Sequence, residues 1–268
     1  MNISALAHQF QENGYVGLSG IFQDVAIQSL IKDLDHWLEN QGKLGKDDSE
    51  YEQRFDVRVD VGLADKFESV ADLFSAQSVR DLTEKVLGHS WNTEGPPLIF
   101  STPINGKQGW HQDTSDVDPG IYMINRIIYP RRVQPEQGGL VVVPGSHQKG
   151  DIPKGGNHDD IDGQIVLFPE AGTIVLMHSR CWHRVQENRV ALPRTQINWR
   201  ARPASAPPNL GNNPVFFELD DGISPRPNED IKLVHVTTFL RLVNTMQGPT
   251  HNSIIACLTD CFPHLTSA

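Results

Sequence analysis

The sequence predicts a mostly β protein with flanking helices, and three observations support this fold class. From about residue 97, short apolar runs alternate with Gly, Pro and Asn, as in "PLIFSTP", "IYMINRIIYP", "GLVVVPGSH" and "TIVLMHS". Runs of this length and composition are typical of strands in an all-β sandwich or barrel. Before them, apolar residues recur at helical spacing, and the chain contains no internal repeat. We therefore expect a β core buttressed by helices.

The elements of the N-terminal part follow from its periodicity. Residues 3–12 predict a short amphipathic helix that ends at Gly14, and "YVGLSGIF" predicts a short strand and a turn. The segment "QDVAIQSLIKDLDHWLENQG" predicts a helix with one buried face. "DDSEYEQRFDVRVD" is charged and reads as a loop followed by a strand, and residues 64–88 predict two helices closed by Gly88.

The last part of the chain carries weaker signals. Residues 203–230 are rich in Pro and Asn, which indicates a long loop, and "IKLVHVTTFLRLVNTM" fits a helix or a strand equally well. We expect one domain over residues 1–268, with a helical part at 1–95, a β core at about 96–202 and a C-terminal extension at 203–268.

Composition excludes several classes of protein. The formal net charge of −10 argues against nucleic acid or an anionic membrane as the partner, because both need a clustered basic surface. No apolar run approaches the roughly 20 residues of a membrane span. The N-terminus lacks the layout of a signal peptide, and 3 cysteines make no secreted disulfide framework. These features predict a cytoplasmic protein.

The stretch "GWHQDTSD" could supply part of a metal site. On a strand, His111 and Asp113 point to the same face and Gln112 to the other, so one nitrogen and one oxygen donor can meet one ion. Two ligands alone make a weak site, and a solvated strand end fits them as well. His183 lies several expected strands later, and two histidines with one carboxylate form the facial triad of non-haem Fe(II) sites. Arg194 opens the next expected strand, where its planar fork can grip a carboxylate.

In combination, these motifs resemble the phytanoyl-CoA dioxygenase group of Fe(II)/2-oxoglutarate-dependent oxygenases. The resemblance runs from about residue 9 to 202, and its pieces occur in the family's order: "WHQD", "GGLVVVPGSHQKG", "GTIVLMHSRCWHRVQEN" and the following arginine. It implies a double-stranded β-helix, a jelly-roll and cupin-like core, and a small-molecule substrate. It also implies Fe(II) as cofactor, with 2-oxoglutarate and O2 as co-substrates.

Carried over residue by residue, the resemblance implies that His111, Asp113 and His183 are iron ligands. Arg194 would bind the distal carboxylate of 2-oxoglutarate. The implied reaction is oxidation, in the first place hydroxylation, of an unactivated C–H bond of a metabolite or natural-product intermediate, with release of succinate and CO2. Because Asp113 is present, halogenation is disfavoured. The alternatives are desaturation, cyclisation or epoxidation with the same iron chemistry, and a metal-binding jelly-roll protein without catalysis.

Other polar residues are candidates for contacts to the co-substrate. Gln196, Asn198 and Arg200 share the face of Arg194 by strand alternation, although part of this row could lie at a wet end of the barrel. We expect Gln196 to contact 2-oxoglutarate. The strand "YMINRIIYP" can turn only one of two neighbours inward, and we choose Asn125.

Hydroxyl and aromatic residues complete the expectations. Ser101 and Thr102 could each offer a hydroxyl to 2-oxoglutarate, and we place Ser101 in the site. Trp110 and Trp182 each precede a ligand, so we expect them to face away from the metal and pack helices against the sheet.

Arginines at six positions of the expected barrel could guide an anionic substrate. The preferred interpretation is that most of them are surface residues in ion pairs. These positions are Arg126, Arg131, Arg132, Arg180, Arg184 and Arg200.

Overall fold

The computed structural model shows a double-stranded β-helix flanked by helices. It describes residues 1–41, 58–61, 67–114, 118, 121–153, 155–208, 210 and 215–216. The contacts of the chain group Met1–Ser224 into one compact unit. Of the loop expected over residues 203–230, the structure describes 203–208, 210 and 215–216, and Val215–Phe216 is a short strand rather than loop. The ambiguous segment 231–246 lies outside the described residues. The expected domain limits therefore stay a prediction.

The helices lie where apolar periodicity predicts them. They are α1 (Ile3–Asn13), α2 (Asp24–Gln41), α3 (Glu68–Ser75) and α4 (Gln77–Leu87). The side chain of Asn2 caps α1 by accepting the Ala5 N–H at 3.1 Å, and Gly14 ends the helix with a φ of 77°, a conformation that favours glycine. Across the described ranges, no helix combines the length and apolarity needed to span a membrane.

The strands form two antiparallel sheets. The 6-stranded sheet has the order β1-β8-β5-β10-β3-β2, and its strands are Tyr15–Leu18, Thr173–His178, Ile124–Tyr129, Arg194–Pro203, Trp91–Thr102 and Arg58–Val61. The 5-stranded sheet has the order β11-β4-β9-β6-β7, and its strands are Val215–Phe216, Gln108–Gln112, His183–Val185, Leu140–Val142 and Ile165–Leu167.

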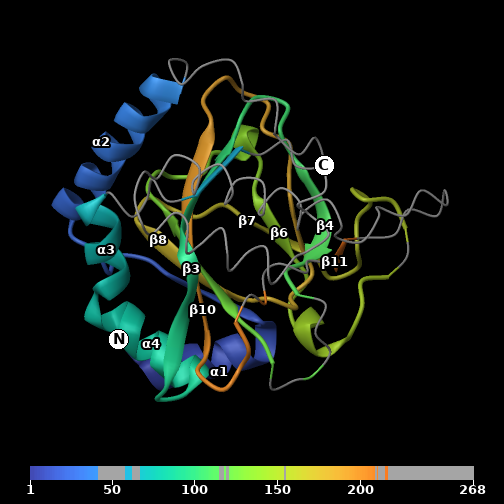
Figure 1. The fold of residues 1–268 in the computed structure, drawn as a ribbon. Helices are drawn as coiled ribbons and strands as arrows, with labels where there is room; N and C mark the ends of the chain where they lie inside the picture. Colours follow the sequence, from blue (N-terminus) through green and yellow to red (C-terminus); the bar gives the residue numbers. More distant parts are fainter. Residues whose placement is uncertain are drawn as a thin grey trace, which may run out of the picture. The chain divides into compact units, whose positions relative to one another are not determined.

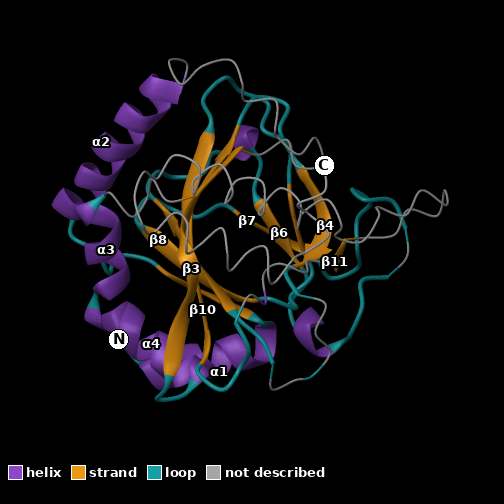
Figure 2. Cartoon of the chain, viewed as in Figure 1, coloured by secondary structure: helices purple, strands orange, loops and turns teal. Residues whose placement is uncertain are grey.

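Helices and sheets are arranged in layers (Figure 1). The four helices lie along one side of the six-stranded sheet, and β4, β6 and β7 lie on its other side. Figure 2 shows the same division, with the longer helices gathered on that side. Two short 3-10 helices, Pro135–Gln137 and Ser146–Gln148, occur in the loops around β6. The expected jelly-roll is confirmed.

Strand alternation in the six-stranded sheet separates the two largest apolar clusters of the core. On β5, Ile124 and Ile128 pack toward the helices, whereas Ile127 and Tyr129 pack between the two sheets. The same alternation separates Ile174 from its neighbour Val175 on β8, and all these side chains are buried. A polar residue on the inner face of such a strand is therefore enclosed between the sheets.

A bulge in β3 keeps the inner face of β10 in register. Asn198 pairs with Leu98 but Arg200 pairs with Glu94, so the extra residues lie on β3, at "GPP" 95–97. Gly95 has a φ of 66°, and glycine and proline are the residues expected at a bulge. Because β10 stays regular against β5, its alternate residues keep pointing between the sheets.

Candidate metal centre

Three buried side chains meet between the sheets. His111 on β4 and His183 on β9 are direct partners in the antiparallel ladder, and their ring centroids are 3.9 Å apart. Asp113 lies one residue beyond the end of β4. Its carboxylate oxygens are 3.9 Å from Nε2 of His111 and 3.7 Å from Nε2 of His183. One donor atom of each residue lies within 4.8 Å of the others, so the three can hold a single metal ion.

Backbone carbonyls fix the orientation of both imidazoles. Nδ1 of His111 lies 2.9 Å from the Gly109 carbonyl, and Nδ1 of His183 lies 2.9 Å from the Cys181 carbonyl. Because a carbonyl only accepts, each Nδ1 carries the proton and each Nε2 keeps a lone pair for a metal. Burial, together with the nearby His183, lowers the pKa of His111 to about 3. The ligand is therefore neutral at physiological pH.

The carboxylate of Asp113 is also held in place. The backbone N–H of Asp113 donates to the Ser179 carbonyl at 2.7 Å, and Nδ2 of Asn125 donates to Oδ2 of Asp113 at 2.6 Å. Burial by itself raises the pKa of this carboxyl, but the neighbouring His183 and Arg200 and the Asn125 hydrogen bond together leave it below its usual value. The group is thus an anion, as metal binding requires.

A polar network from β10 supports the carboxylate. Oδ1 of Asn125 accepts hydrogen bonds from Asn198 at 2.7 Å and from Nε of Arg200 at 3.2 Å. Nη2 of Arg200 lies 3.6 Å from Oδ1 of Asp113. We expected Asn125 to contact the co-substrate, and the structure places it against Asp113 instead. Gln196 lies on the same face of β10, where it pairs with β3 and is half-buried.

Arg194 lies at the start of β10 with its guanidinium buried. Nη1 donates to the carbonyls of Gln137, at 3.1 Å, and Gly138, and Nη2 donates to the Thr102 hydroxyl at 3.2 Å. Among the described residues, Nε has no hydrogen-bond partner, and the Thr102 hydroxyl is the one acceptor of Nη2. These two donors form one edge of the planar fork, which is the edge that a carboxylate grips with both oxygens.

The structure corrects the choice of hydroxyl near this arginine. Ser101 pairs with β10 on the face of Ile99, which packs toward the helices, so it points away from Arg194. Thr102 carries the hydroxyl on the inner face.

Tyr129 was not identified from the sequence, although alternation along β5 places it on the inner face with Asn125. Burial, partly offset by nearby Arg194, raises the pKa of Tyr129 to about 12. The phenol is therefore a hydrogen-bond donor at neutral pH.

The residues flanking the ligands point away from the metal centre, as expected. Gln112 donates to the carbonyls of Gly150 and Arg180 at 3.2 Å and 2.9 Å. The two tryptophans, however, do not pack helices against the sheet. The indole of Trp110 donates to the Asp159 carbonyl at 2.8 Å, and that of Trp182 donates to the Gly150 carbonyl at 2.9 Å. The expected helix packing is wrong, because loop residues, among them Ile152 and Ile161, pack against the cluster of these two indoles on the outer face of the sheet.

The structure separates the six arginines. Three form ion pairs, namely Arg131 with Asp35, Arg132 with Glu170 and Arg184 with Asp160. Arg180 also has an interaction partner, and Arg126 is buried on the helix side of β5. Arg200 alone of the six lies beside the metal centre, with a side chain that is 19% exposed. Three of the six thus have the ion pairs that the preferred interpretation expects, and Arg131 and Arg132 are the two whose pairs lie at the surface.

Comparison with solved structures identifies the same fold in non-haem metal enzymes. The epimerase SnoN, solved with Fe3+, alpha ketoglutarate and nogalamycin RO, aligns with a TM-score of 0.58 at 13% identity over 84% of this chain and 92% of its own. HygX from Streptomyces hygroscopicus, solved with nickel and 2-oxoglutarate, aligns with a TM-score of 0.59 at 15% identity over 75% and 87%. EctD from S. alaskensis, solved with 2-oxoglutarate and 5-hydroxyectoine, gives 0.59 at 19% identity over 75% and 76%.

A search of curated protein sequences found no match. A family model does match: that of phytanoyl-CoA dioxygenase, over residues 10–195. The match includes both sheets as far as the first residues of β10, and it contains His111, Asp113, His183 and Arg194. With a facial set of two histidines and one carboxylate enclosed by a jelly-roll, the chain belongs to the phytanoyl-CoA dioxygenase family.

Proposed function

We propose that this protein is an Fe(II)- and 2-oxoglutarate-dependent dioxygenase that hydroxylates an unactivated C–H bond of a small-molecule metabolite or natural-product intermediate. Succinate and CO2 are the co-products. The observation that carries the proposal is the buried cluster of His111, Asp113 and His183, together with the partly unpartnered guanidinium of Arg194. Family membership and the metal and 2-oxoglutarate found in similar structures support it.

The residues present fit an Fe(II) ion. Two imidazole nitrogens and one carboxylate oxygen are the donor set of non-haem iron oxygenases, and they leave coordination positions open for other ligands. The hydrogen bonds to the Gly109 and Cys181 carbonyls keep both Nε2 lone pairs available. When bound, the metal supplies the capacity to activate O2 and to polarise the keto acid. The protein supplies the orientation of the ligands and a buried setting.

Arg194 would bind the distal carboxylate of 2-oxoglutarate. Its Nη1 is fixed by two backbone carbonyls, so the guanidinium cannot rotate freely, and its remaining donor edge is preorganised for a carboxylate. Thr102 and the protonated phenol of Tyr129 lie near this guanidinium and can donate to the same carboxylate. The inner ends of β3, β5 and β10 would thus form the co-substrate pocket.

The type of oxidation is proposed as hydroxylation. The carboxylate of Asp113 occupies the position that a halide would need, which disfavours halogenation. The structurally similar SnoN is an epimerase, and EctD was solved with a hydroxylated compound, so one fold supports several outcomes. Product analysis distinguishes hydroxylation from desaturation, cyclisation, epoxidation and epimerisation.

We further propose that the primary substrate is anionic. Arg200 approaches Asp113 at 3.6 Å through Nη2 and donates from Nε to Asn125, so among the described residues Nη1 remains for another ligand. The metal dication, Arg194 and Arg200 together carry four positive charges, whereas Asp113 and the 2-oxoglutarate dianion carry three negative ones. The centre would therefore favour a carboxylate or phosphonate group on the substrate.

The proposal is tested by adding Fe(II) and 2-oxoglutarate to the purified chain and measuring succinate with and without O2. Asp113→Ala and His183→Ala should lose Fe(II)-dependent succinate formation, whereas His36→Ala, on α2, should keep it. Binding of 2-oxoglutarate to metal-loaded protein under anaerobic conditions separates co-substrate binding from turnover. Activity that survives either triad substitution would show that the ligand assignment is wrong. Absence of 2-oxoglutarate binding would favour the non-catalytic metal-binding alternative.

A further inference from the structure

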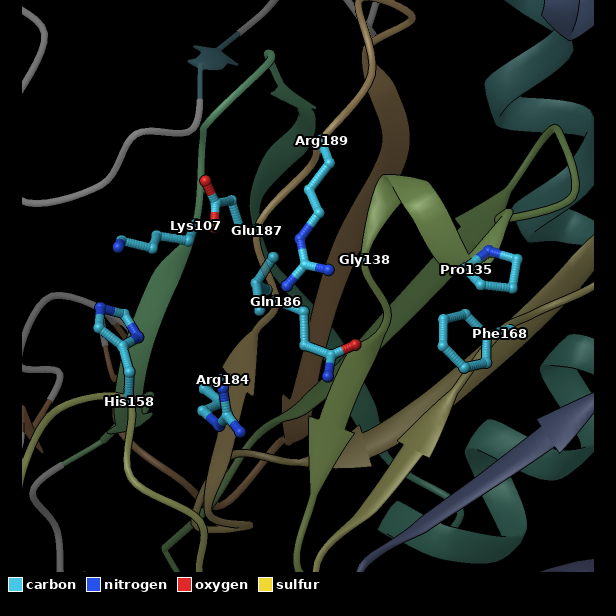
Figure 3. Close-up of a pocket in the computed structure, with 10 residues that line it drawn as sticks. Lys107, Pro135, Gly138, His158, Phe168, Arg184, Gln186, Glu187 and Arg189 are labelled. Atoms are coloured by element: carbon cyan, nitrogen blue, oxygen red, sulfur yellow. The ribbon is translucent and has the colours of Figure 1, made fainter.

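We infer that a groove on the outer face of the five-stranded sheet binds an organic oxyanion, at a site separate from the metal centre. The groove has a volume of about 400 Å3. We call it the oxyanion groove. Its basic side chains are Lys107, Arg184 and Arg189, and its apolar side chains include Pro135 and Phe168 (Figure 3).

Strand alternation separates the oxyanion groove from the metal centre. Arg184 follows His183 on β9, so its side chain lies on the opposite face of the sheet. The guanidinium of Arg184 lies 5.2 Å from the ring centroid of Trp110, which belongs to the outer apolar cluster. The part of the groove that Arg184 lines therefore lies on the face of the sheet opposite the triad.

Two of the three basic residues of the groove have no ion pair among the described residues, and the third, Arg184, pairs with Asp160. Lys107 and Arg189 are exposed, and within the part of the chain that the structure describes neither forms an ion pair. Arg184 is 8% exposed, and its Nε is a buried donor without a hydrogen-bond partner in the same part. Its Nη2 pairs with Asp160 at 2.9 Å. Glu187 is the one acidic residue that lines the groove among those described.

The buried Nε of Arg184, which has no hydrogen-bond partner among the described residues, indicates a ligand-binding site rather than a solvated surface. An unsatisfied buried donor on a charged group is costly, because the group has lost water and gained no acceptor. An oxyanion has several acceptor oxygens and can bind an arginine fork while lysine contributes a point charge. In a chain with a net charge of −10, Lys107 and Arg189 bring two cations without an ion pair among the described residues to one groove, which favours an anionic ligand there.

The apolar side of the groove indicates that the oxyanion belongs to a larger molecule. Phe168 is 41% exposed, and Figure 3 shows it beside Pro135, across the groove from Lys107 and Arg184, with Arg189 extending between them. Exposed aromatic and proline surfaces next to cations suit a flat apolar group that carries an anion. The ligand class is therefore a phosphate or carboxylate attached to an apolar body.

Binding of phenyl phosphate, benzoate and inorganic phosphate to the metal-free full chain, measured by isothermal titration calorimetry, tests this inference. Arg189→Ala and Lys107→Ala should each weaken phenyl phosphate binding by roughly 5- to 10-fold, because each removes one charged contact. Arg132→Ala is the matched control, since Arg132 is exposed, pairs with Glu170 and does not line the groove. It should leave the Kd unchanged.

Two further comparisons sharpen the test. Phe168→Ala should weaken phenyl phosphate and benzoate but leave inorganic phosphate unaffected, because only the first two have a ring. Tighter binding of phenyl phosphate than of benzoate would identify a phosphate ligand, and the reverse would identify a carboxylate. Asp113→Ala should bind all three as the parent does, so the result stands apart from the proposed activity. No binding, or equal Kd values in the parent, Arg189→Ala and Lys107→Ala, would overturn the inference.

Discussion

Asn125 is the residue through which β10 acts on the metal centre. Its amide accepts from Asn198 and Arg200 and donates to Oδ2 of Asp113, so the amide cannot flip without losing all three contacts. A fixed amide holds the carboxylate plane and disfavours protonation of that oxygen. Partners of this kind commonly change metal affinity by 10- to 100-fold when they are removed.

We therefore predict that Asn125→Ala weakens Fe(II) binding roughly 10-fold, because Asp113 loses the hydrogen bond from the Asn125 amide. Titration with Fe(II) under anaerobic conditions measures the affinity. Asn92→Ala, an exposed asparagine on β3, is the matched control and should bind as the parent does. Unchanged affinity in Asn125→Ala would show that the hydrogen bond does not hold the ligand.

Arg200 permits a separate prediction about the substrate. Its ion pair with Asp113 is long, at 3.6 Å, so Arg200→Gln should affect metal binding less than Asn125→Ala does. If Arg200 binds an anionic substrate, this variant should keep the substrate-free release of succinate. It should lose the stimulation of that release by anionic candidate metabolites. Arg131→Gln, on the surface, should keep both. Stimulation that persists in Arg200→Gln would contradict the proposed role.

At the scale of elements, one buried arginine connects a helix to the six-stranded sheet. The guanidinium carbon of Arg126 lies 5.3 Å from the ring centroid of Phe74 on α3, 5.1 Å from that of Trp91 and 5.8 Å from that of Trp199. Nε donates to the Trp199 carbonyl at 2.8 Å, while Nη2 is buried and has no partner among the described residues. Burial lowers the pKa of Arg126 to about 10, so it remains a cation at neutral pH.

We predict that Arg126→Ala lowers the free energy of unfolding by about 2–4 kcal/mol, because it leaves a cavity among three aromatic rings. Arg126→Met should lose less, since its side chain fills much of the same space and buries no charge. Urea denaturation measures both. Arg131→Ala removes a half-exposed ion pair and should cost at most about 1 kcal/mol. A loss in Arg126→Ala no larger than in Arg131→Ala would show that the aromatic contacts contribute little.

The sequence predicted the individual helices and strands better than it predicted which strands pair with each other. Helical periodicity placed the four helices, and the run "YVGL" predicted β1. The pairing of β1 with β8 could not be predicted, because the two strands lie far apart in the chain and local pattern carries no information on long-range register. The packing of Trp110 and Trp182 was wrong for the same reason: alternation gives the face but not what covers it.

At the scale of the whole molecule, His178 makes folding sensitive to acid. It ends β8, stacks on Tyr122 with ring centroids 4.7 Å apart, and its Nδ1 accepts the Arg180 N–H at 3.0 Å. Burial, together with nearby His147 and Arg180, lowers its pKa to about 3. Between about pH 6.5 and 3, the unfolded chain therefore binds a proton that the folded chain does not. The contribution of neutral His178 to the free energy of unfolding is therefore fully present above about pH 6.5, and it is lost as the pH falls toward 3.

We predict that the free energy of unfolding of metal-free protein falls with decreasing pH below about 6, and that His178→Gln makes this dependence shallower by about 1 kcal/mol per pH unit. Urea denaturation at several pH values measures the slope. His111 is present in both proteins, so its contribution cancels in the difference. His8→Gln, on the exposed face of α1, controls for the loss of a histidine. Equal slopes for the parent and His178→Gln would contradict the prediction.

The sequence by itself determined the kinds of element, the set of metal-binding side chains and the family resemblance. These features depend on periodicity and on motifs that are local in the chain, so they are visible without coordinates. Only the tertiary structure decided that Thr102 rather than Ser101 faces Arg194, that Asn125 holds Asp113, and that Arg200 alone among six arginines lies at the centre. The physical reason is that such contacts join residues on different strands, where register and bulges, not local pattern, set which side chains meet.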